Sequence, residues 1–260
     1  MTFSPVLPAT GLIGWNFLTR TIDQQKEILA NDGALKREIS YFKENFSNVR
    51  SAEDLVNDRS LLKVALGAFG LQDDLDNKFF IQKMIEDGTS ERTALSNLLA
   101  DSRYKEFAST FDFADPRVGS ENFTAQIVND YKSQSFETAI GEQNSDFRLA
   151  LNLERTIGEI GAQGTSNDTK WFTILGNPPL RTVFETAFRL PTAFGSLPID
   201  TQLETIKERA RQNFGTDSVS ELSTEETQKA LVKDFLLQSQ VAGIATLSSQ
   251  STALTLLQGL

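Results

Sequence analysis

The chain has 260 residues, of which 39% are hydrophobic and 23% are charged, and its net charge at neutral pH is −10. A chain of this length and composition can bury a core as one large or two small globular domains. The acidic excess argues against nucleic-acid binding, because contacts with phosphates need a basic surface.

The chain contains neither cysteine nor histidine. This excludes disulfides, thiol chemistry, zinc sites built from Cys and His, and every Ser-His or Cys-His mechanism. Histidine is also the commonest general base near neutral pH, so its absence weakens an enzymatic interpretation. Carboxylates, lysines and tyrosines remain, but no pattern among them identifies a catalytic residue. We therefore expect no enzyme, no cofactor and no metal.

The first 18 residues lack the pattern of a cleavable secretory signal peptide. They have no basic n-region and no continuous apolar h-region, and prolines stand at positions 5 and 8. Residues 241–260, the C-terminal segment, are uncharged and contain eight Ser, Thr and Gln residues. A membrane span needs about 20 predominantly apolar residues, so we expect a soluble protein without a membrane span.

Apolar residues recur mostly at helical spacing, and strand signals are scarce. After an extended segment at 1–10, the spacing predicts an N-terminal half over 11–115. Its predicted helices cover 11–31, 34–46, 51–56, 58–70, 75–86, 91–99 and 101–110. Asp115-Pro116 closes this half.

The C-terminal half, 116–240, opens with the longest helical pattern, 121–161. Gly141 and Asn144 offer a break there, so the pattern fits one kinked helix or two separate helices. A polar loop is predicted at 164–169, followed by a helix that Asn177 caps before two prolines. Further helices are predicted over 200–214 and 224–240, and Ser223 with Glu226 forms a capping box for the last.

Three segments share one pattern. In each, an apolar pair leads into Asp58, Asp101 or Asn177, and apolar residues then follow at three- and four-residue spacing. Asp and Asn are good N-caps, so each segment predicts a helix, a turn, a cap and a second helix. The sequence therefore predicts an all-α fold, a multi-helix bundle of repeated helix-turn-helix units around one long or kinked central helix.

The acidic run at 72–77 superficially resembles a calcium-binding loop. Counted from Asp74, an EF-hand needs glycine at the sixth position and glutamate at the twelfth, where Phe79 and Ile85 stand. We interpret the run as carboxylates at a helix N-terminus, which complement the helix dipole.

Other polar candidates have equally plain interpretations. Tyr41 and Lys43 have no identifiable acid–base partner, and core packing is the favoured interpretation of their segment. A di-metal carboxylate bundle needs Glu-x-x-His motifs, which a chain without histidine cannot supply. We therefore interpret the carboxylates of 121–161 as solvated surface; they are Glu137, Glu142, Asp146, Glu154 and Glu159.

The C-terminal segment is the feature that best indicates a function. Its apolar residues recur at helical spacing with Ser251 in the gap, and Leu256 and Leu260 widen the stripe. Such a segment can fold onto its own domain, stay disordered, pair as a coiled coil or dock in a partner's groove. Our candidate partner-binding residues are Ile244, Leu247, Leu254 and Leu257.

Several stretches resemble a bacterial family of uncharacterised all-helical proteins, a domain of unknown function often encoded near flagellar genes. They are YFKENFSNVRSAEDLVNDRSLLKVALGAFGL at 41–71, LLADSRYKEFASTFDFAD at 98–115, TRTIDQQ at 19–25, LRTVFETAFRLP at 180–191 and ALTLLQGL at 253–260. The family has no established catalytic residues. The resemblance implies an all-helical fold and a link to flagellar assembly or motility. Flagellar axial subunits also commonly lack cysteine and assemble through terminal helices, although the N-terminus here has no clear heptad helix.

The favoured hypothesis is a non-enzymatic interaction protein, a flagellum-associated accessory or structural component, located in the cytoplasm or at the flagellum. It binds one or more protein partners and no nucleic acid. An alternative is a helical binding or scaffold module unrelated to flagella. The third hypothesis is a carboxylate- or lysine-based enzyme, which requires a pocket where Asp, Glu, Lys or Tyr side chains converge. The pattern does not fix the oligomeric state.

Overall fold

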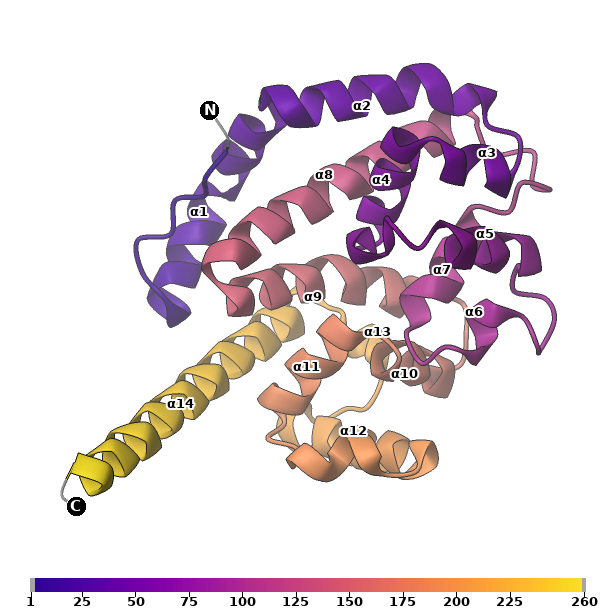
Figure 1. Cartoon of the computed structure of the whole chain (residues 1–260). Helices are drawn as coiled ribbons and strands as arrows, with labels where there is room; N and C mark the ends of the chain where they lie inside the picture. The colour runs from indigo at the N-terminus through magenta and orange to yellow at the C-terminus, as the bar shows by residue number, and fades with distance from the viewer. Residues whose placement is uncertain (1–2, 259–260) are drawn as a thin grey trace. The chain divides into compact units, whose positions relative to one another are not determined.

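A computed structural model describes the backbone of residues 3–258 and the side chains of residues 3–243. In this part of the chain every regular element is a helix, so the predicted all-α class is confirmed (Figure 1). The chain forms two compact units: unit 1 is Met1–Val6 with Arg20–Gln143, and unit 2 is Leu7–Thr19 with Asn144–Leu260. Helix α1 (Gly11–Ala30) contributes residues to both units.

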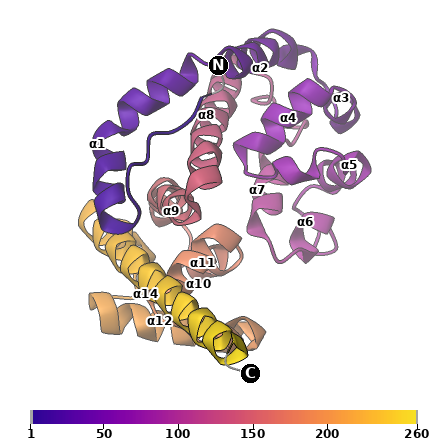
Figure 2. The ribbon, with the colours of Figure 1, turned by 60° about the vertical axis from the view of Figure 1, so that its left-hand side comes forward.

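Unit 1 is built around α4, which packs along α8 and α2, as Figures 1 and 2 show. Every residue of α4 from Leu61 to Ala68, apart from Lys63, is buried. The other helices of unit 1 pack beside α4 and α8 or against one another. In chain order the helices of the unit are α2 (Gly33–Asn45), α3 (Ala52–Asn57), α4 (Arg59–Ala68), α5 (Lys78–Asp87), α6 (Leu95–Leu98), α7 (Ser102–Thr110) and α8 (Glu121–Gln143), with 3-10 turns η1 (Phe46–Asn48) and η2 (Gln72–Asp74).

Aromatic rings fill the core of unit 1. Phe42 of α2 stacks on Phe46 at 4.7 Å between ring centroids, and Phe107 of α7 lies 4.8 Å from Phe111. The two pairs meet where Phe46 packs edge-on against Phe111 at 6.0 Å. Since none of the four side chains is exposed, this cluster joins α2, η1 and α7 into one core.

Unit 2 is built around α9 (Ser145–Ala162), which packs against α11, α13 and α14. Trp171 packs edge-on against Phe184 at 5.3 Å, and Trp15 lies 5.8 Å from Phe147. The remaining helices are α10 (Asn167–Leu175), α11 (Pro178–Ala187), α12 (Ile199–Phe214), α13 (Val219–Leu222) and α14 (Glu225–Gln258), with the 3-10 turn η3 (Thr192–Ser196).

The three predicted caps stand at helix starts. The carboxylate of Asp58 accepts hydrogen bonds from two amides of α4, that of Asp101 from one amide of α7, and Asn177 from the amide of Leu180 in α11. Each of the three segments therefore forms a helix, a cap and a second helix. That the three are copies of one repeat remains a prediction from the sequence.

The long pattern at 121–161 is two helices. The side-chain oxygen of Asn144 accepts a hydrogen bond from the Phe147 amide at 3.0 Å and so caps α9 immediately after α8 ends. The compact units divide at this cap, whereas the repeat pattern placed the division after Asp115. Helix α8 belongs with unit 1 because it packs along α4.

Several predicted helix ends differ in the structure. Helix α10 begins inside the expected polar loop, because the Ser166 hydroxyl caps it at the Thr169 amide. Ser223 does not open α14; its hydroxyl donates to the Ser220 carbonyl at the end of α13. Helix α14 does not end at Gln240 but runs to Gln258. Helix α6 covers only the last part of the predicted helix at 91–99.

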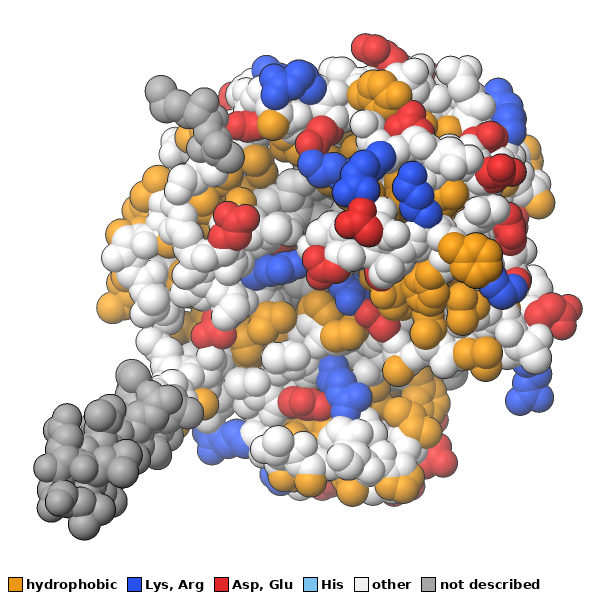
Figure 3. All heavy atoms as spheres, in the orientation of Figure 1, with side chains coloured by type: hydrophobic (Ala, Val, Ile, Leu, Met, Phe, Trp, Pro, Cys, Tyr) orange, Lys and Arg blue, Asp and Glu red, His pale blue; other side chains and the backbone are white. Residues whose placement is uncertain are grey.

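None of the helices in the described part of the chain has the length and apolar character of a bilayer-spanning segment. On the face drawn in Figure 3, acidic and basic side chains are interspersed, and neither sign dominates.

Candidate functional site

Helix α14 is held in unit 2 by four apolar side chains, the anchor residues. They face α11 and α9, and none is more than 1% exposed: Leu231, Val232, Phe235 and Leu236. Burying one such side chain stabilises a protein by about 1.5–3 kcal/mol relative to leaving it in water. The anchor residues therefore fix the first part of α14 firmly.

Two contacts lie just beyond the anchor residues. The Ser239 hydroxyl donates to the Asp146 carboxylate at 2.5 Å. Gly11, at the start of α1, has φ +60°, and a Cβ there would lie 2.0 Å from Nε2 of Gln240. Glycine is needed here both for the left-handed backbone and for the close approach of α14. Asp146 is thus engaged with α14, contrary to its interpretation as solvated surface.

After these contacts α14 leaves the core of unit 2. Leu237 is 37% exposed and Val241 61% exposed, and the residues from Gln240 to Ala242 are all exposed. The helix nevertheless continues to Gln258 (Figure 1). The Ser, Thr and Gly of the C-terminal segment have low helix propensity, and most of the stability of helices in proteins comes from packing. A helix of this kind gains its stability by packing against another surface.

The four residues predicted to bind a partner stand in this part of α14. The side chains of Ile244, Leu247, Leu254 and Leu257 lie outside the described residues, so their role stays a prediction. The described side chains add Leu237 and Val241 to the apolar surface. Leu237 was missed because the segment was drawn from Val241, although the uncharged run begins at Phe235. Its signal is the spacing, since Leu237 stands one heptad before Ile244.

Lysine 170 lies buried where α9, α10 and α13 meet. It is only 7% exposed, and its ammonium donates to the Gly161 carbonyl and the Ser220 hydroxyl, both at 2.8 Å. The carbonyl groups at the C-terminal end of α9 attract a positive charge, and this attraction compensates for the burial of the Lys170 ammonium. A Cβ on Gly161 would lie 2.2 Å from the Ser223 hydroxyl, so α9 and the turn before α14 are in close contact. Lys170 thereby ties α9, α10 and α13 together.

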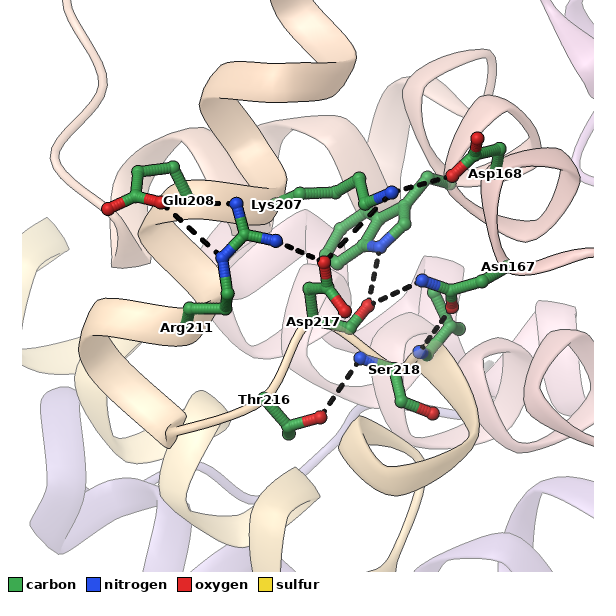
Figure 4. A network of polar contacts seen from close by, with 10 residues as sticks. Asn167, Asp168, Lys207, Glu208, Arg211, Thr216, Asp217 and Ser218 are labelled. Atoms are coloured by element: carbon green, nitrogen blue, oxygen red, sulfur yellow. Dashed lines mark hydrogen bonds and ion pairs between the residues drawn. The ribbon is translucent and has the colours of Figure 1, made fainter.

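A polar network fixes the turn between α12 and α13 (Figure 4). The main-chain carbonyl of Asp217 accepts hydrogen bonds from Asn167 Nδ2 at 2.9 Å and from Trp171 Nε1 at 2.8 Å. Asn167 Oδ1 in turn accepts from the Val219 amide at 2.9 Å. Side chains of α10 thus satisfy the backbone of a turn that has no regular structure of its own.

Charged side chains surround the same turn. Lys207 lies 2.7 Å from Asp168 and 3.9 Å from Asp217, and Arg211 binds both Asp217 and Glu208 (Figure 4). These side chains are all partly exposed, and exposed ion pairs contribute at most about 1 kcal/mol each. Since the opposite charges satisfy one another, we interpret the network as support for the packing of α10 against α12 and not as a reactive site.

In unit 1, titratable side chains converge on a cavity of about 280 Å³. Its polar lining includes Asp32, Lys63, Gln72, Tyr131, Thr138 and Glu142. Beside it, the Tyr131 hydroxyl and the Lys63 ammonium donate to the two oxygens of Glu38, each at 2.5 Å. This is the kind of pocket that the enzyme hypothesis requires.

The state of Tyr131 argues against catalysis at this cavity. Burial, together with the hydrogen bond to the Glu38 carboxylate, raises the pKa of the Tyr131 hydroxyl far above its usual value. The hydroxyl therefore stays protonated and serves Glu38 as a donor. An acid–base group should instead have a pKa near the working pH. Tyr131 therefore does not have the pKa that the enzyme hypothesis requires of an acid–base group at this cavity.

The remaining candidates have local structural roles. Tyr41 is 40% exposed and donates to Asp58 at 2.7 Å, so the core packing expected of its segment holds for Phe42 but not for Tyr41 or the exposed Lys43. Glu137 is buried, contrary to expectation, because α8 is buried over a wide arc.

In the acidic run, Asp74 accepts hydrogen bonds from Asn77 and Tyr104. Across the part of the chain that the structure describes, no group of three or more carboxylates is arranged to hold a metal ion.

The fold and these sites describe an all-helical bundle whose last helix extends beyond its own core. Residues 68–228 match the sequence model of the family described as "Protein of unknown function (DUF1217)". The match spans more than half of the chain, and the protein belongs to this family. The matched range ends before the anchor residues and the C-terminal segment.

The chain is similar to a protein of known structure. The crystal structure of protein AGR_C_984 from Agrobacterium tumefaciens has a TM-score of 0.73 and 26% sequence identity to it, over 91% of this chain and 98% of that chain. No curated protein matches the sequence.

Proposed function

We propose that this protein is a non-enzymatic interaction protein that binds a protein partner through the distal part of α14, residues 237–258. The observation that supports the proposal is the change along one helix. The anchor residues are buried, Leu237 and Val241 are exposed, and the helix continues to Gln258. Its C-terminal segment carries no charge.

The composition of this segment indicates what kind of surface its partner offers. Because the segment has no charged residue, ion pairs across the interface cannot involve it, and packing of apolar side chains supplies the affinity. An amphipathic helix recognises either a second amphipathic helix or an apolar groove. We expect a helix of the partner, and binding that changes little with salt concentration.

We further propose that the partner is a flagellar protein and that this chain is an accessory or structural component of the flagellum. The support is the resemblance to a family often encoded near flagellar genes, together with the absence of cysteine and an exposed terminal helix. A helical scaffold without flagellar partners is the alternative, and the identity of the captured protein separates the two.

The test compares substitutions on two faces of the same helix. At 100° per residue, Leu247 and Leu254 lie on the side of the helix that carries the other two candidate residues, whereas Ser249 and Thr252 lie on the side opposite these four. The double variant Leu247→Asp with Leu254→Asp places two charges in the stripe. The matched control, Ser249→Asp with Thr252→Asp, makes the same charge change away from it. Deletion of residues 241–260 is the third variant.

We would measure swimming, flagellar number by electron microscopy, and flagellar proteins retained by each purified variant. The stripe variant and the deletion should lose the partner and impair swimming, and the control should keep both. Normal swimming and unchanged retention in the stripe variant would overturn the proposal. Retention of a single non-flagellar protein, lost only with the stripe, would support the scaffold alternative and remove the flagellar assignment.

A further inference from the structure

The cavity of unit 1 has no part in the interaction proposed for α14, and its lining indicates a function of its own. Its volume of about 280 Å³ lies just below the usual range for drug-sized ligands, so it suits a molecule with few heavy atoms. Most of the lining surface is apolar, with Phe3, Leu29 and Ala139 in the wall, and polar side chains stand among these apolar groups.

One wall of the cavity is the ring of Tyr131, and its position depends on Gly67 of α4. A Cβ at position 67 would lie 2.5 Å from a ring carbon of Tyr131. Because Gly67 has no side chain, the ring of Tyr131 on α8 packs directly against α4. Glu38 then fixes the tyrosine hydroxyl, so this wall is rigid before any ligand arrives.

Lysine 63 supplies a positive group. Its side chain is 46% exposed, and its ammonium uses one hydrogen on Glu38. An ammonium has three donors, so two remain for a ligand. Because the carboxylate of Glu38 holds the ammonium beside the cavity, Lys63 is oriented to receive a carboxylate.

The carboxylates of Asp32 and Glu142 supply negative groups. One oxygen of Asp32 caps α2 by accepting from the amides of Ala34 and Leu35, at 2.8 and 3.3 Å. Those hydrogen bonds lower the pKa of Asp32, so it is ionised at neutral pH. The Phe3 amide also donates to Asp32, whose negative charge still attracts an ammonium group, and the exposed carboxylate of Glu142 can accept hydrogen bonds from it.

These charges select the class of ligand. A simple anion would meet Lys63 but also Asp32, Glu142 and the Glu38 carboxylate that already pairs with Lys63, and a simple cation would leave the two remaining donors of Lys63 without an acceptor. A molecule that carries both an ammonium and a carboxylate satisfies both sets at once. We infer that the unit 1 cavity binds a small zwitterion of the amino-acid class, held by Lys63 at its carboxylate and by Asp32 and Glu142 at its ammonium.

The first test uses the full-length protein and the twenty common amino acids as probes, with binding measured by calorimetry. At least one should bind with a Kd below about 1 mM. The best probe is then compared with two analogues that share its side chain; for leucine these are 3-methylbutylamine, without the carboxylate, and 4-methylpentanoate, without the ammonium. Each analogue should bind at least about tenfold more weakly, by roughly the worth of one charge-assisted hydrogen bond.

Variants then locate the site. Lys63→Met should weaken binding at least tenfold, and Glu142→Gln, at an exposed position that folding tolerates, should weaken it severalfold. Lys83→Met is the matched control, because Lys83 pairs with Asp87 elsewhere in unit 1. Failure of all twenty amino acids to bind would overturn the inference. The inference would also be overturned if either analogue bound as tightly as the amino acid it is compared with. It would be overturned as well if Lys83→Met lost as much affinity as Lys63→Met.

Discussion

The two parts of α14 have the same helical backbone but opposite surroundings. In the first part, the anchor residues are buried against α11 and α9. In the distal part, Leu237 and Val241 are exposed, and no charged residue follows Asp234. The first part belongs to the core of unit 2 and stabilises it, whereas the distal part contributes apolar surface that its own unit leaves uncovered. If the distal part binds a partner as proposed, substitutions in the two parts should have separable effects on stability and on binding.

The largest expected effect comes from the anchor residues. Phe235→Ala should lower the free energy of unfolding of unit 2 by about 3–5 kcal/mol, because it removes a buried aromatic ring and leaves a cavity. Leu237→Ala, two residues further along the helix, should change it by less than about 0.5 kcal/mol. Both tryptophans of the chain, Trp15 and Trp171, belong to unit 2, so their fluorescence during urea unfolding reports this unit. Equal losses in the two variants would contradict the division of α14.

The next effect concerns the buried ammonium of Lys170, which joins α9, α10 and α13. Lys170→Met keeps most of the apolar stem but removes both hydrogen bonds at the end of α9, which leaves the Gly161 carbonyl with the Ser220 hydroxyl as its donor. The free energy of unfolding of unit 2 should fall by about 1–3 kcal/mol. Lys233→Met, at an exposed position on α14, is the control and should change it by less than about 0.5 kcal/mol. An unchanged tryptophan transition in Lys170→Met would show that this buried cation does not hold the unit together.

Local features of this fold could be predicted, because they depend on residues close in sequence. The caps at Asp58, Asp101 and Asn177, and the break at Asn144, each follow from one side chain and the amides just after it. The error at Ser223 is also local: several Ser and Thr residues stand together there, and the packing of α13 decided which of them ends one helix and which precedes the next.

Features that depend on distant residues could not be predicted. The cavity of unit 1 needs Glu38 beside Lys63, 25 residues away, and beside Tyr131, 93 residues away. Nothing in the local pattern around Tyr131 indicates this pairing. The full length of α14 was missed for another reason: the predicted end at Gln240 followed a change of composition toward Ser, Thr and Gly, and the helix continues through it.

A smaller effect is expected when the C-terminal segment is removed. Deletion of residues 241–260 should change the free energy of unfolding of unit 2 by less than about 0.5 kcal/mol, because the described residues at the start of this segment are exposed. The deletion should still abolish partner binding, so stability and binding separate in a single variant. Tryptophan fluorescence in urea measures the first quantity and retention of the partner the second. A deletion that destabilises unit 2 by several kcal/mol would mean that the segment packs onto its own unit.

The smallest effect concerns the charged first turn of α14. Lys229 donates to Glu225 at 2.5 Å, one helical turn apart. This pair lowers the pKa of Glu225 from 4.5 and raises the pKa of Lys229 from 10.5. A carboxylate with a lowered pKa contributes stability above its unfolded pKa, and that contribution is lost as the pH falls through the folded pKa. An ammonium with a raised pKa contributes below its unfolded pKa, and that contribution is lost as the pH rises through the folded pKa.

The ion pair should therefore stabilise α14 at pH values between the folded pKa of Glu225 and the folded pKa of Lys229, and not outside that range. Glu225→Gln should lower the urea midpoint slightly near neutral pH and leave it unchanged in acid below the folded pKa of Glu225. The difference should shrink as salt is added, because both side chains are exposed. The matched comparison is Glu226→Gln, which stands in the same turn. A difference between wild type and Glu225→Gln that persisted in acid would assign the effect to helix propensity and not to the ion pair. The anchor residues alone would then account for the stability of the first part of α14.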